Sequence, residues 1–205
     1  MNTCAKCEKQ YSTTKHYLLH AKECNGIDKL TCPRCMHTFS SSGNKCKHIK
    51  INNCKPLSIL TYAQEHGKDI ELYINDYGKE RIDYIDEKYI VGMVLRMGYD
   101  AILSYIEKKY FNEYFPENHT IKKTDKNYMI RKNGNWQNID KHNLLKDLFA
   151  RNGHELAKIM HQENNPSTHD NVNTVYLEVN KKDKNIKLSI DDLIINHSLF
   201  QTAKN

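Results

Sequence analysis

Two stretches of this chain, CAKCEKQYSTTKHYLLHAKEC at residues 4–24 and CPRCMHTFSSSGNKCKHIKINNC at residues 32–54, share one spacing of cysteines and histidines. Each reads Cys-x2-Cys-x12-His and ends in a further cysteine, and the second begins 28 residues after the first. A cysteine pair on a hairpin and a His–Cys pair on a helix present four donors tetrahedrally, as in structural Zn²⁺ sites. The sequence therefore predicts two zinc ions per chain, held by these ligands: Cys4, Cys7, His20 and Cys24 in the first site, and Cys32, Cys35, His48 and Cys54 in the second.

Three other residues could compete for the metal. Cys46 is a spare thiol inside the second stretch, but His48 reproduces the x12 spacing of the first stretch and is the predicted ligand. His16 lies too close to Cys7 for this arrangement. His37 follows the second cysteine pair and is expected to be solvated.

All seven cysteines lie in the first 54 of the 205 residues. Met1–Thr3 offers no apolar stretch for a signal peptide, and clustered cysteines in a reducing compartment are most often metal ligands. An intracellular location is therefore expected. The best apolar run, residues 90–95, is far shorter than the ~20 residues of a membrane span, so no membrane contact is expected.

Aromatic residues accompany both ligand sets: Tyr11 and Tyr17 in the first, and Phe39 in the second. Together with the ligand spacing, they resemble the ββα zinc-finger family, in the variant whose last histidine is replaced by cysteine. The resemblance implies a small core of one aromatic and one leucine, and a domain that cannot fold without its metal.

The second stretch departs from that family pattern. Lys45 stands where the core leucine would be. An irregular second helix, packed through Ile49 or Ile51, is therefore expected.

The basic charge is concentrated in the same part of the chain. Residues 1–56 carry ten Lys/Arg and three Asp/Glu, which gives +7, while residues 57–205 carry 21 and 22, which gives −1. Such an asymmetry is typical of an arm that binds an acidic polymer, and lysines can neutralise the phosphates of DNA or RNA. The alternative is that these lysines only keep a small metal module in solution.

If the family's docking on DNA holds, three helix positions per finger face bases: Thr13, His16 and Leu19 in the first, and Ser41, Asn44 and Lys47 in the second. Leu19 can donate nothing, Arg34 is the only arginine of the module, and two fingers span only about six base pairs. Contact with phosphates is thus favoured over sequence reading. The residues predicted to contact nucleic acid are Lys15, His16, Asn44, Lys47 and Lys50.

Beyond Pro56 the patterns predict a mixed helix and hairpin region. Helices are expected at 58–66, at 86–97, at 100–110 and from Asp140 to about Met160, and 69–77 is either a strand or a helix. Short strands are expected at 120–123, 127–131 and around Trp136, with Asn133-Gly134 as the hairpin turn. A polar loop at 162–174, a hairpin pairing 175–179 with 186–190 and a short helix capped by Ser189 complete the prediction.

The block PENHTI at 116–121, followed by the Tyr128-Met129 strand, Trp136 and a leucine-rich helix, carries a second resemblance. Together with the fingers, it is similar to uncharacterised zinc-finger proteins of giant nucleocytoplasmic large DNA viruses, over residues 1–56 and 100–150. The resemblance implies two ββα-like fingers followed by an α/β region. It also implies a host nucleus or a cytoplasmic virus factory as the location, and it carries no activity.

No catalytic pattern stands out in the sequence. His154-Glu155 begins like a metalloprotease motif, but His161 lies seven positions later, about 10 Å along a helix, so the two histidines cannot share a metal. Neither a glycine-rich phosphate loop nor a GxSxG elbow occurs. His119 and His142 flank the hairpin without metal-ligand partners at a recognised interval. The chain is therefore not expected to be an enzyme.

These observations predict an α+β protein with two tandem ββα zinc fingers and a mixed helix/hairpin domain. The expected divisions are finger one at 1–27, finger two at 28–56, an α+β domain at 57–162, and a loop, hairpin and short helix at 163–205. The leading hypothesis is a zinc-dependent nucleic-acid-binding protein. The alternative is an adaptor whose fingers dock on protein in a viral assembly, and a protein partner is possible through residues 57–205.

Overall fold

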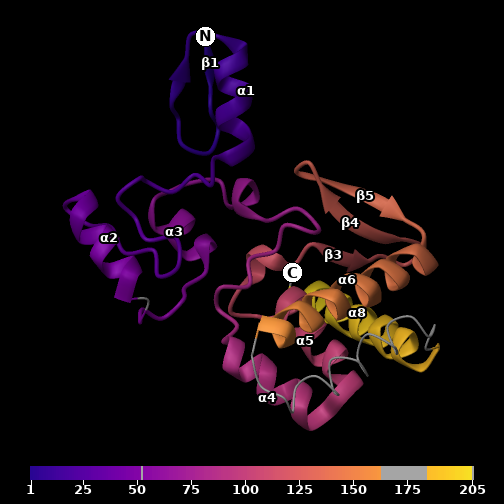
Figure 1. Cartoon of the computed structure of the whole chain (residues 1–205). Helices are drawn as coiled ribbons and strands as arrows, with labels where there is room; N and C mark the ends of the chain where they lie inside the picture. Colours follow the sequence, from indigo (N-terminus) through magenta and orange to yellow (C-terminus); the bar gives the residue numbers. More distant parts are fainter. Residues whose placement is uncertain (52, 163–183, 205) are drawn as a thin grey trace. The chain divides into compact units, whose positions relative to one another are not determined.

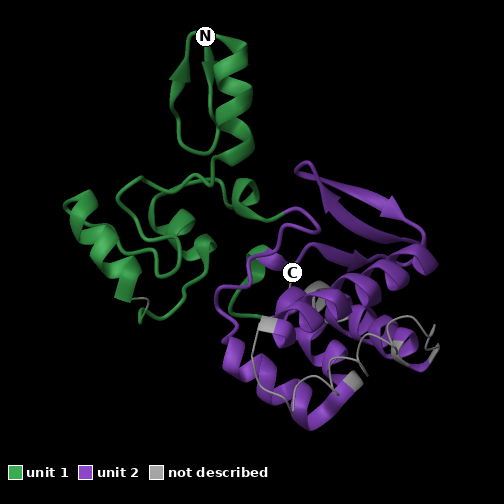
Figure 2. Cartoon of the chain, viewed as in Figure 1, with its two compact units in different colours: residues 1–75, 113–117 green, residues 76–112, 118–205 purple. Residues whose placement is uncertain are grey.

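The computed structural model describes residues 1–51, 53–162 and 184–204 (Figure 1). It divides into two compact units, residues 1–75 with 113–117 and residues 76–112 with 118–205 (Figure 2). The first unit runs past the predicted end of the fingers at residue 56, because residues 57–75 bond to the finger loops. Helices and two small antiparallel sheets make up the described part, which confirms the α+β class.

The first finger is a small hairpin followed by a helix. Strand β1 (Asn2–Thr3) pairs with β2 (Gln10–Tyr11), and helix α1 spans Thr14–Glu23. The Thr13 hydroxyl accepts a hydrogen bond from the His16 N–H and so caps the helix. The predicted ββα order is therefore present in this finger.

The second finger keeps the helix but shortens the hairpin. Its strands are reduced to one bridge between Thr31 and Thr38, and helix α2 runs over Ser42–Ile51. The helix is a regular α-helix, so the expected irregularity is wrong. Ile49 and Ile51 are also exposed, which corrects the expectation that they pack.

Lys45 explains how this helix does without a core leucine. Its Nζ donates to the backbone oxygen of Lys29 at 2.9 Å, so the side chain ties α2 to the segment that leads into the finger. A polar anchor has replaced an apolar one.

Residues 57–75 form a short helix and a 3₁₀ turn around a small apolar cluster. Helix α3 (Ile59–Glu65), predicted at 58–66, is capped by Ser58, and η1 (Ile70–Tyr73) is capped by Asp69. The segment 69–77, expected as a strand or a helix, thus holds one 3₁₀ turn. Leu60, Ala63 and Tyr73 form the buried centre of this cluster.

Two consecutive helices come first among the helices of the second unit. Helix α4 (Glu87–Met97) begins at Asp86, whose side chain accepts from the Lys88 N–H at 2.7 Å, and ends at Gly98, whose φ of 56° stops the helix. A 3₁₀ turn, η2 (Gly98–Asp100), leads into α5 (Ala101–Tyr110). Both helices agree with the sequence prediction.

A three-stranded antiparallel sheet and a long helix follow. After η3 (Pro116–Asn118), the strands β3 (Ile121–Lys123), β4 (Tyr128–Lys132) and β5 (Asn135–Ile139) lie in sequence order. Asn133 and Gly134 have φ values of 52° and 77°, as a type I′ hairpin turn requires, so the predicted Asn-Gly turn is confirmed. Helix α6 then spans Lys141–Gln162.

The last described element corrects a prediction. Residues 186–190, expected as the second strand of a hairpin, belong to helix α8 (Lys184–Lys204), and the first expected strand, 175–179, lies outside the described residues. Ser189 is inside the helix, where its Oγ donates to the backbone oxygen of Asn185. Ile190 and Ile194, one helical turn apart, are both fully buried. This segment therefore packs on the core through one face of a helix and not through alternate residues of a strand.

The second unit is built around one apolar core. Helices α4, α5, α6 and α8 and the inner face of the sheet all contribute to it (Figure 1). Its largest side chains with less than 2% exposure are Ile90, Met93, Ile102, Tyr105, Ile106, Tyr110, Ile121, Leu144, Leu148, Leu156, Met160 and Ile190. Among the helices described here, none is both long enough and apolar enough to cross a bilayer.

Candidate metal centres

The structure gathers the eight predicted ligands into two groups of four. In each group one donor atom per residue lies within 4.8 Å of the other three, and the groups are Cys4, Cys7, His20 and Cys24, and Cys32, Cys35, His48 and Cys54. The His20 Nε2 lies 3.2 Å from the Cys7 Sγ, and the His48 Nε2 lies 3.4 Å from the Cys35 Sγ. Donors about 2.1 and 2.3 Å from one tetrahedral zinc lie about 3.6 Å apart, so both groups fit this ion.

The two cysteine pairs have the same backbone geometry. The Cys4 N–H donates to the Lys9 oxygen at 2.9 Å, and the Glu8 N–H returns to the Cys4 oxygen at 2.7 Å. Cys32 makes the corresponding bonds, 28 residues later, to His37 and Met36 at 2.8 and 2.9 Å. These bonds turn each chain segment so that both sulfurs of a pair point the same way.

An aromatic ring supports each ligating histidine. The Tyr11 and His20 rings are stacked, with centroids 4.8 Å apart, and the Phe39 and His48 rings lie at the same separation with a steeper tilt. This contact fixes the imidazole so that Nε2 faces the sulfurs. The aromatic positions noted in the sequence therefore orient the ligands, which is the usual role of residues behind a metal site.

The first site resists ionising all of its thiols in the absence of a cation. Burial opposes ionisation of Cys4, but N–H groups of Cys7 and Lys6 and the His20 ring outweigh it and lower the pKa of Cys4 to about 7. Burial, together with the Cys7 and Cys4 sulfurs, raises the pKa of Cys24 to about 11. A third thiolate is therefore disfavoured until a divalent cation offsets the charge.

The second site repeats this division. Burial opposes ionisation of Cys32, yet the Cys35 and Arg34 N–H groups lower its pKa. Burial and the Cys35 and Cys32 thiols raise the pKa of Cys54 to about 11. In both sites, the last cysteine of the stretch is the thiol whose ionisation depends most on a bound cation.

Both donor sets are complete without an outside ligand. Three sulfurs and one imidazole fill the four positions of a tetrahedral ion and leave no position for water or substrate. A closed set of this kind is the arrangement of structural zinc, not of catalytic zinc. The clusters are thus consistent with two structural zinc ions per chain.

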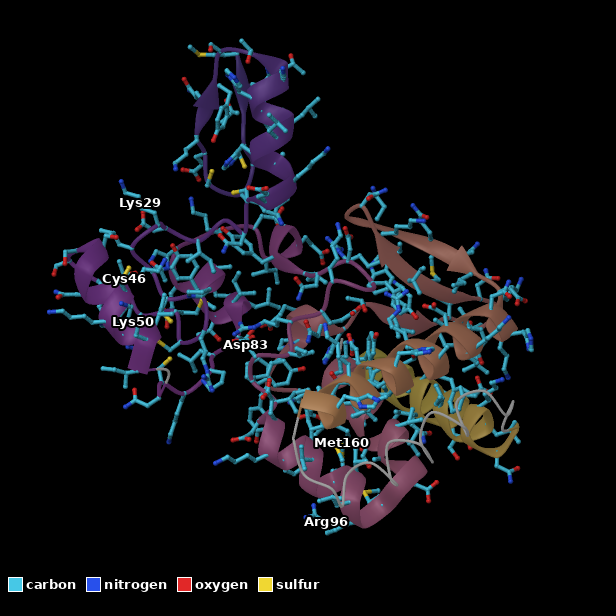
Figure 3. All side chains as sticks on the ribbon, viewed as in Figure 1. Lys29, Cys46, Lys50, Asp83, Arg96 and Met160 are labelled. Atoms are coloured by element: carbon cyan, nitrogen blue, oxygen red, sulfur yellow. The ribbon has the colours of Figure 1, made fainter. Side chains whose placement is uncertain are left out.

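The competing residues lie outside the clusters. Cys46 and Lys50 both lie on α2, and Cys46 is exposed there (Figure 3). His16 is exposed on α1, and His37 packs edge-on against Phe39. The ligand choice made from the x12 spacing therefore agrees with the geometry.

The five residues predicted to contact nucleic acid all lie exposed on the two finger helices: Lys15 and His16 on α1, and Asn44, Lys47 and Lys50 on α2. Two of the positions expected to face bases have another role, because the hydroxyls of Thr13 and Ser41 cap their helices through the N–H groups of His16 and Asn44. These contacts remain predictions.

Sequence reasoning missed how residues 57–75 join the fingers. The Tyr73 hydroxyl donates to the Lys6 oxygen at 3.0 Å, and its ring leaves no room for a side chain at Gly26, where a Cβ would lie 2.6 Å away. Tyr62 accepts from the Asp28 N–H, and Lys68 pairs with Glu8 at 2.5 Å. Partners 34 to 67 residues apart carry no spacing signal in the sequence.

A polar group inside the second unit was also missed. Lys109 has a side-chain exposure of 3%, and its Nζ lies 2.6 Å from an Oε of Glu155, which also accepts from the Tyr105 hydroxyl. Glu155, which the sequence connects only with an incomplete metalloprotease-like motif, is therefore the partner of a buried cation. His154 beside it is exposed.

Comparisons with protein-family models, with curated proteins and with solved structures found no match for this chain. The likeness to viral zinc-finger proteins accordingly stays a prediction.

Proposed function

We propose that this chain is a zinc-dependent nucleic-acid-binding protein that contacts phosphates mainly through its finger pair. The observation that carries the proposal is a charge of +7 on residues 1–56, of which +4 lies on the two helices that the metal sites hold in place. Helix α2 has three lysines and no acidic residue. Backbone phosphates attract such a surface whatever the base sequence.

The arrangement of the lysines favours phosphate contact over base reading. Lys47 and Lys50 are exposed and three positions apart on α2, so they lie on one face of the helix. Lys45 is bound to the Lys29 oxygen and takes no part. With Leu19 in a base-facing position, the first finger can recognise little base sequence. The two fingers together therefore bind the phosphate backbone of the nucleic acid.

We propose that the protein is not an enzyme. The closed donor sets suit structural zinc, which stabilises the finger fold and activates no water. The chain's own contribution is to hold α1 and α2 in a form that exposes their lysines.

The salt dependence of binding tests the proposal. We expect the log of the affinity of the zinc-loaded chain for random duplex or single strand to fall with log salt at a slope of roughly −4 to −5, for four to six contacts at ~0.9 each. Lys47→Glu with Lys50→Glu should reduce the steepness by about two on every sequence alike. Lys146→Glu with Lys158→Glu, two exposed lysines of α6, makes the same charge change and should have little effect.

Two results would contradict the proposal. One is binding that does not depend on salt over about 50–200 mM. The other is an equal loss in the α6 control, which would mean that net charge and not the finger surface governs binding.

A second function is favoured by apolar residues on the same helices. Leu18 and Leu19 on α1 are 54% and 56% exposed, and Ile49 and Ile51 on α2 are 44% and 66% exposed. Exposed apolar side chains of this size suit protein docking, as in an adaptor within a viral assembly. Leu19→Ser with Ile51→Ser would abolish such docking and leave salt-dependent nucleic-acid binding in place.

A further inference from the structure

The three-stranded sheet of the second unit has two unlike faces. The register pairs Ile121 with Ile130 and Tyr128 with Ile139, and these four residues are buried or packed on the apolar core. Partners in register share a face. The sheet therefore has an inner face that is part of the core and an opposite, outer face.

The outer face has four partly or fully exposed residues, Lys122, Met129, Trp136 and Asn138, and one buried residue, Arg131, which pairs with Trp136. The register aligns Lys122 with Met129 and Met129 with Asn138 across the three strands. Apart from Arg131, the side chains of this face are partly or fully exposed, in contrast to 1% for Ile121 on the inner face. Polar, aromatic and basic groups thus occupy a surface that the core does not use.

Trp136 is the chain's only tryptophan, and it lies on this outer face. The Lys122 Nζ lies 4.1 Å from the centroid of its ring. Because Lys122 is on β3 and Trp136 is on β5, the indole reaches across the central strand to meet it. A cation placed in this way orients the indole on the sheet and brings positive charge to the face of the ring.

The sheet is also basic, although its domain is not. Residues 121–139 carry five Lys/Arg and one acidic residue, a charge of +4, whereas the rest of 57–205 carries −5 by difference. Arg131 is buried, and the exposed Lys132 pairs with Asn135 on the inner-face side of the register. Lys126, in the turn between β3 and β4, is exposed. A positive sheet in an otherwise acidic domain indicates an anionic partner.

We propose that the outer face binds single-stranded nucleic acid, with a base stacked on Trp136 and phosphates contacted by Lys122 and Lys126. The proposal deepens the function proposed above by naming the strand type. Bases in a duplex are already stacked on one another, so an indole on a sheet can receive only the bases of a single strand. DNA and RNA single strands share this chemistry.

Because the chain has one tryptophan, its fluorescence reports on this face alone. The zinc-loaded full chain is titrated with oligothymidylate and with oligouridylate of about twelve nucleotides, and with a duplex of the same length. Saturable quenching by a single strand and none by the duplex is expected, and the two single strands distinguish DNA from RNA. Quenching by the duplex alone would overturn the proposal.

Substitution at the ring gives the second measurement, with a dye-labelled oligothymidylate followed by anisotropy. Loss of one base stack is worth roughly 1–3 kcal/mol, so Trp136→Ala should weaken binding about 5- to 150-fold. Trp136→Phe, which keeps a ring and guards against misfolding, should lose less. A single-strand affinity unchanged in Trp136→Ala would overturn the proposal.

Tyr89 provides the matched control. It is 44% exposed on α4, and the Lys108 Nζ lies 4.8 Å from its ring centroid, but Asp86 and Glu87 adjoin it. Tyr89→Ala should leave binding unchanged, and an equal loss there would overturn the proposal. Because Lys47→Glu with Lys50→Glu tests the fingers separately, a loss only in that variant rejects the sheet alone, and a loss only in Trp136→Ala rejects the fingers alone.

Discussion

The fingers and the second unit hold their shapes by different means. Neither finger helix has a buried residue, whereas α5 alone buries six, and the most shielded finger side chains include the ligands Cys4 and Cys32. In the second unit, four helices and a sheet share one apolar core. Short modules that cannot bury enough apolar surface use a metal for the same purpose.

The largest test of this contrast is to remove the metal. Chelation should unfold the fingers and leave the second unit folded, because structural zinc supplies an apparent ~10–16 kcal/mol that nothing in α1 or α2 replaces. Circular dichroism should show partial loss of helix while the fluorescence of Trp136, in the second unit, is retained. A single cooperative loss of both signals would contradict the division.

Substitution of single cysteines sharpens the same test. Cys35→Ser should lower the zinc content of the purified chain from two ions to one, because Cys35 belongs to the second donor set. Cys46→Ser, in the exposed spare thiol of the same finger, should leave it at two.

The ion pair of the buried Lys109 with Glu155 should give the next largest effect, confined to the second unit. Glu155→Leu leaves Lys109 buried without its carboxylate, which should cost about 3–5 kcal/mol. Lys109→Met should cost less, because Glu155 is 36% exposed and can be hydrated. Urea unfolding followed by Trp136 fluorescence measures both, and zinc content should stay at two.

The same substitution placed in both units compares them directly. Leu148→Ala, at a fully buried position of α6, should lower the free energy of unfolding of the second unit by about 2–5 kcal/mol. Leu18→Ala on α1, 54% exposed, should change finger stability by less than about 0.5 kcal/mol. Similar costs at the two sites would show that the fingers have an apolar core after all.

The sequence predicted best what depends on local spacing. The eight ligands, the capped helix that starts at Asp86 and the Asn133-Gly134 turn each carry their signal within a few residues. Such features need no knowledge of distant partners, because ligand chemistry, caps and turn dihedrals are set locally.

What sequence reasoning missed depends on tertiary partners. Residues 186–190 alternate well enough for a strand, and only the core reveals that Ile190 and Ile194 face it from one side of a helix. The pairing of Lys109 with Glu155 joins residues 46 apart. Lys45 was expected to disturb the helix of the second finger. Its acceptor is the backbone oxygen of Lys29, and a backbone acceptor leaves no signal in the residue pattern.

A smaller effect is expected where the fingers meet residues 57–75. Tyr73→Phe removes the hydroxyl that donates to the Lys6 oxygen, which should cost about 1 kcal/mol. Because Lys6 lies between the ligands Cys4 and Cys7, the loss should appear as faster zinc release from the first site to a chelator. Tyr89→Phe in the second unit is the control and should not change that rate.

The smallest expected effect is a gain in finger stability. Met36 follows the second cysteine pair with a φ of 59°, a left-handed conformation that costs a residue with a Cβ roughly 1–2 kcal/mol. Glycine adopts it freely, although it also gives the unfolded chain more freedom, worth about 0.4–1 kcal/mol. Met36→Gly should therefore stabilise the second finger by up to about 1 kcal/mol, seen as a slower loss of its zinc to a chelator.

The control is Lys47→Gly inside α2, which should destabilise the same finger by about 1 kcal/mol, because glycine weakens a helix interior. If both substitutions destabilise the finger, the Met36 side chain contributes more by its contacts than its backbone costs, and the metal is not the only support of that turn.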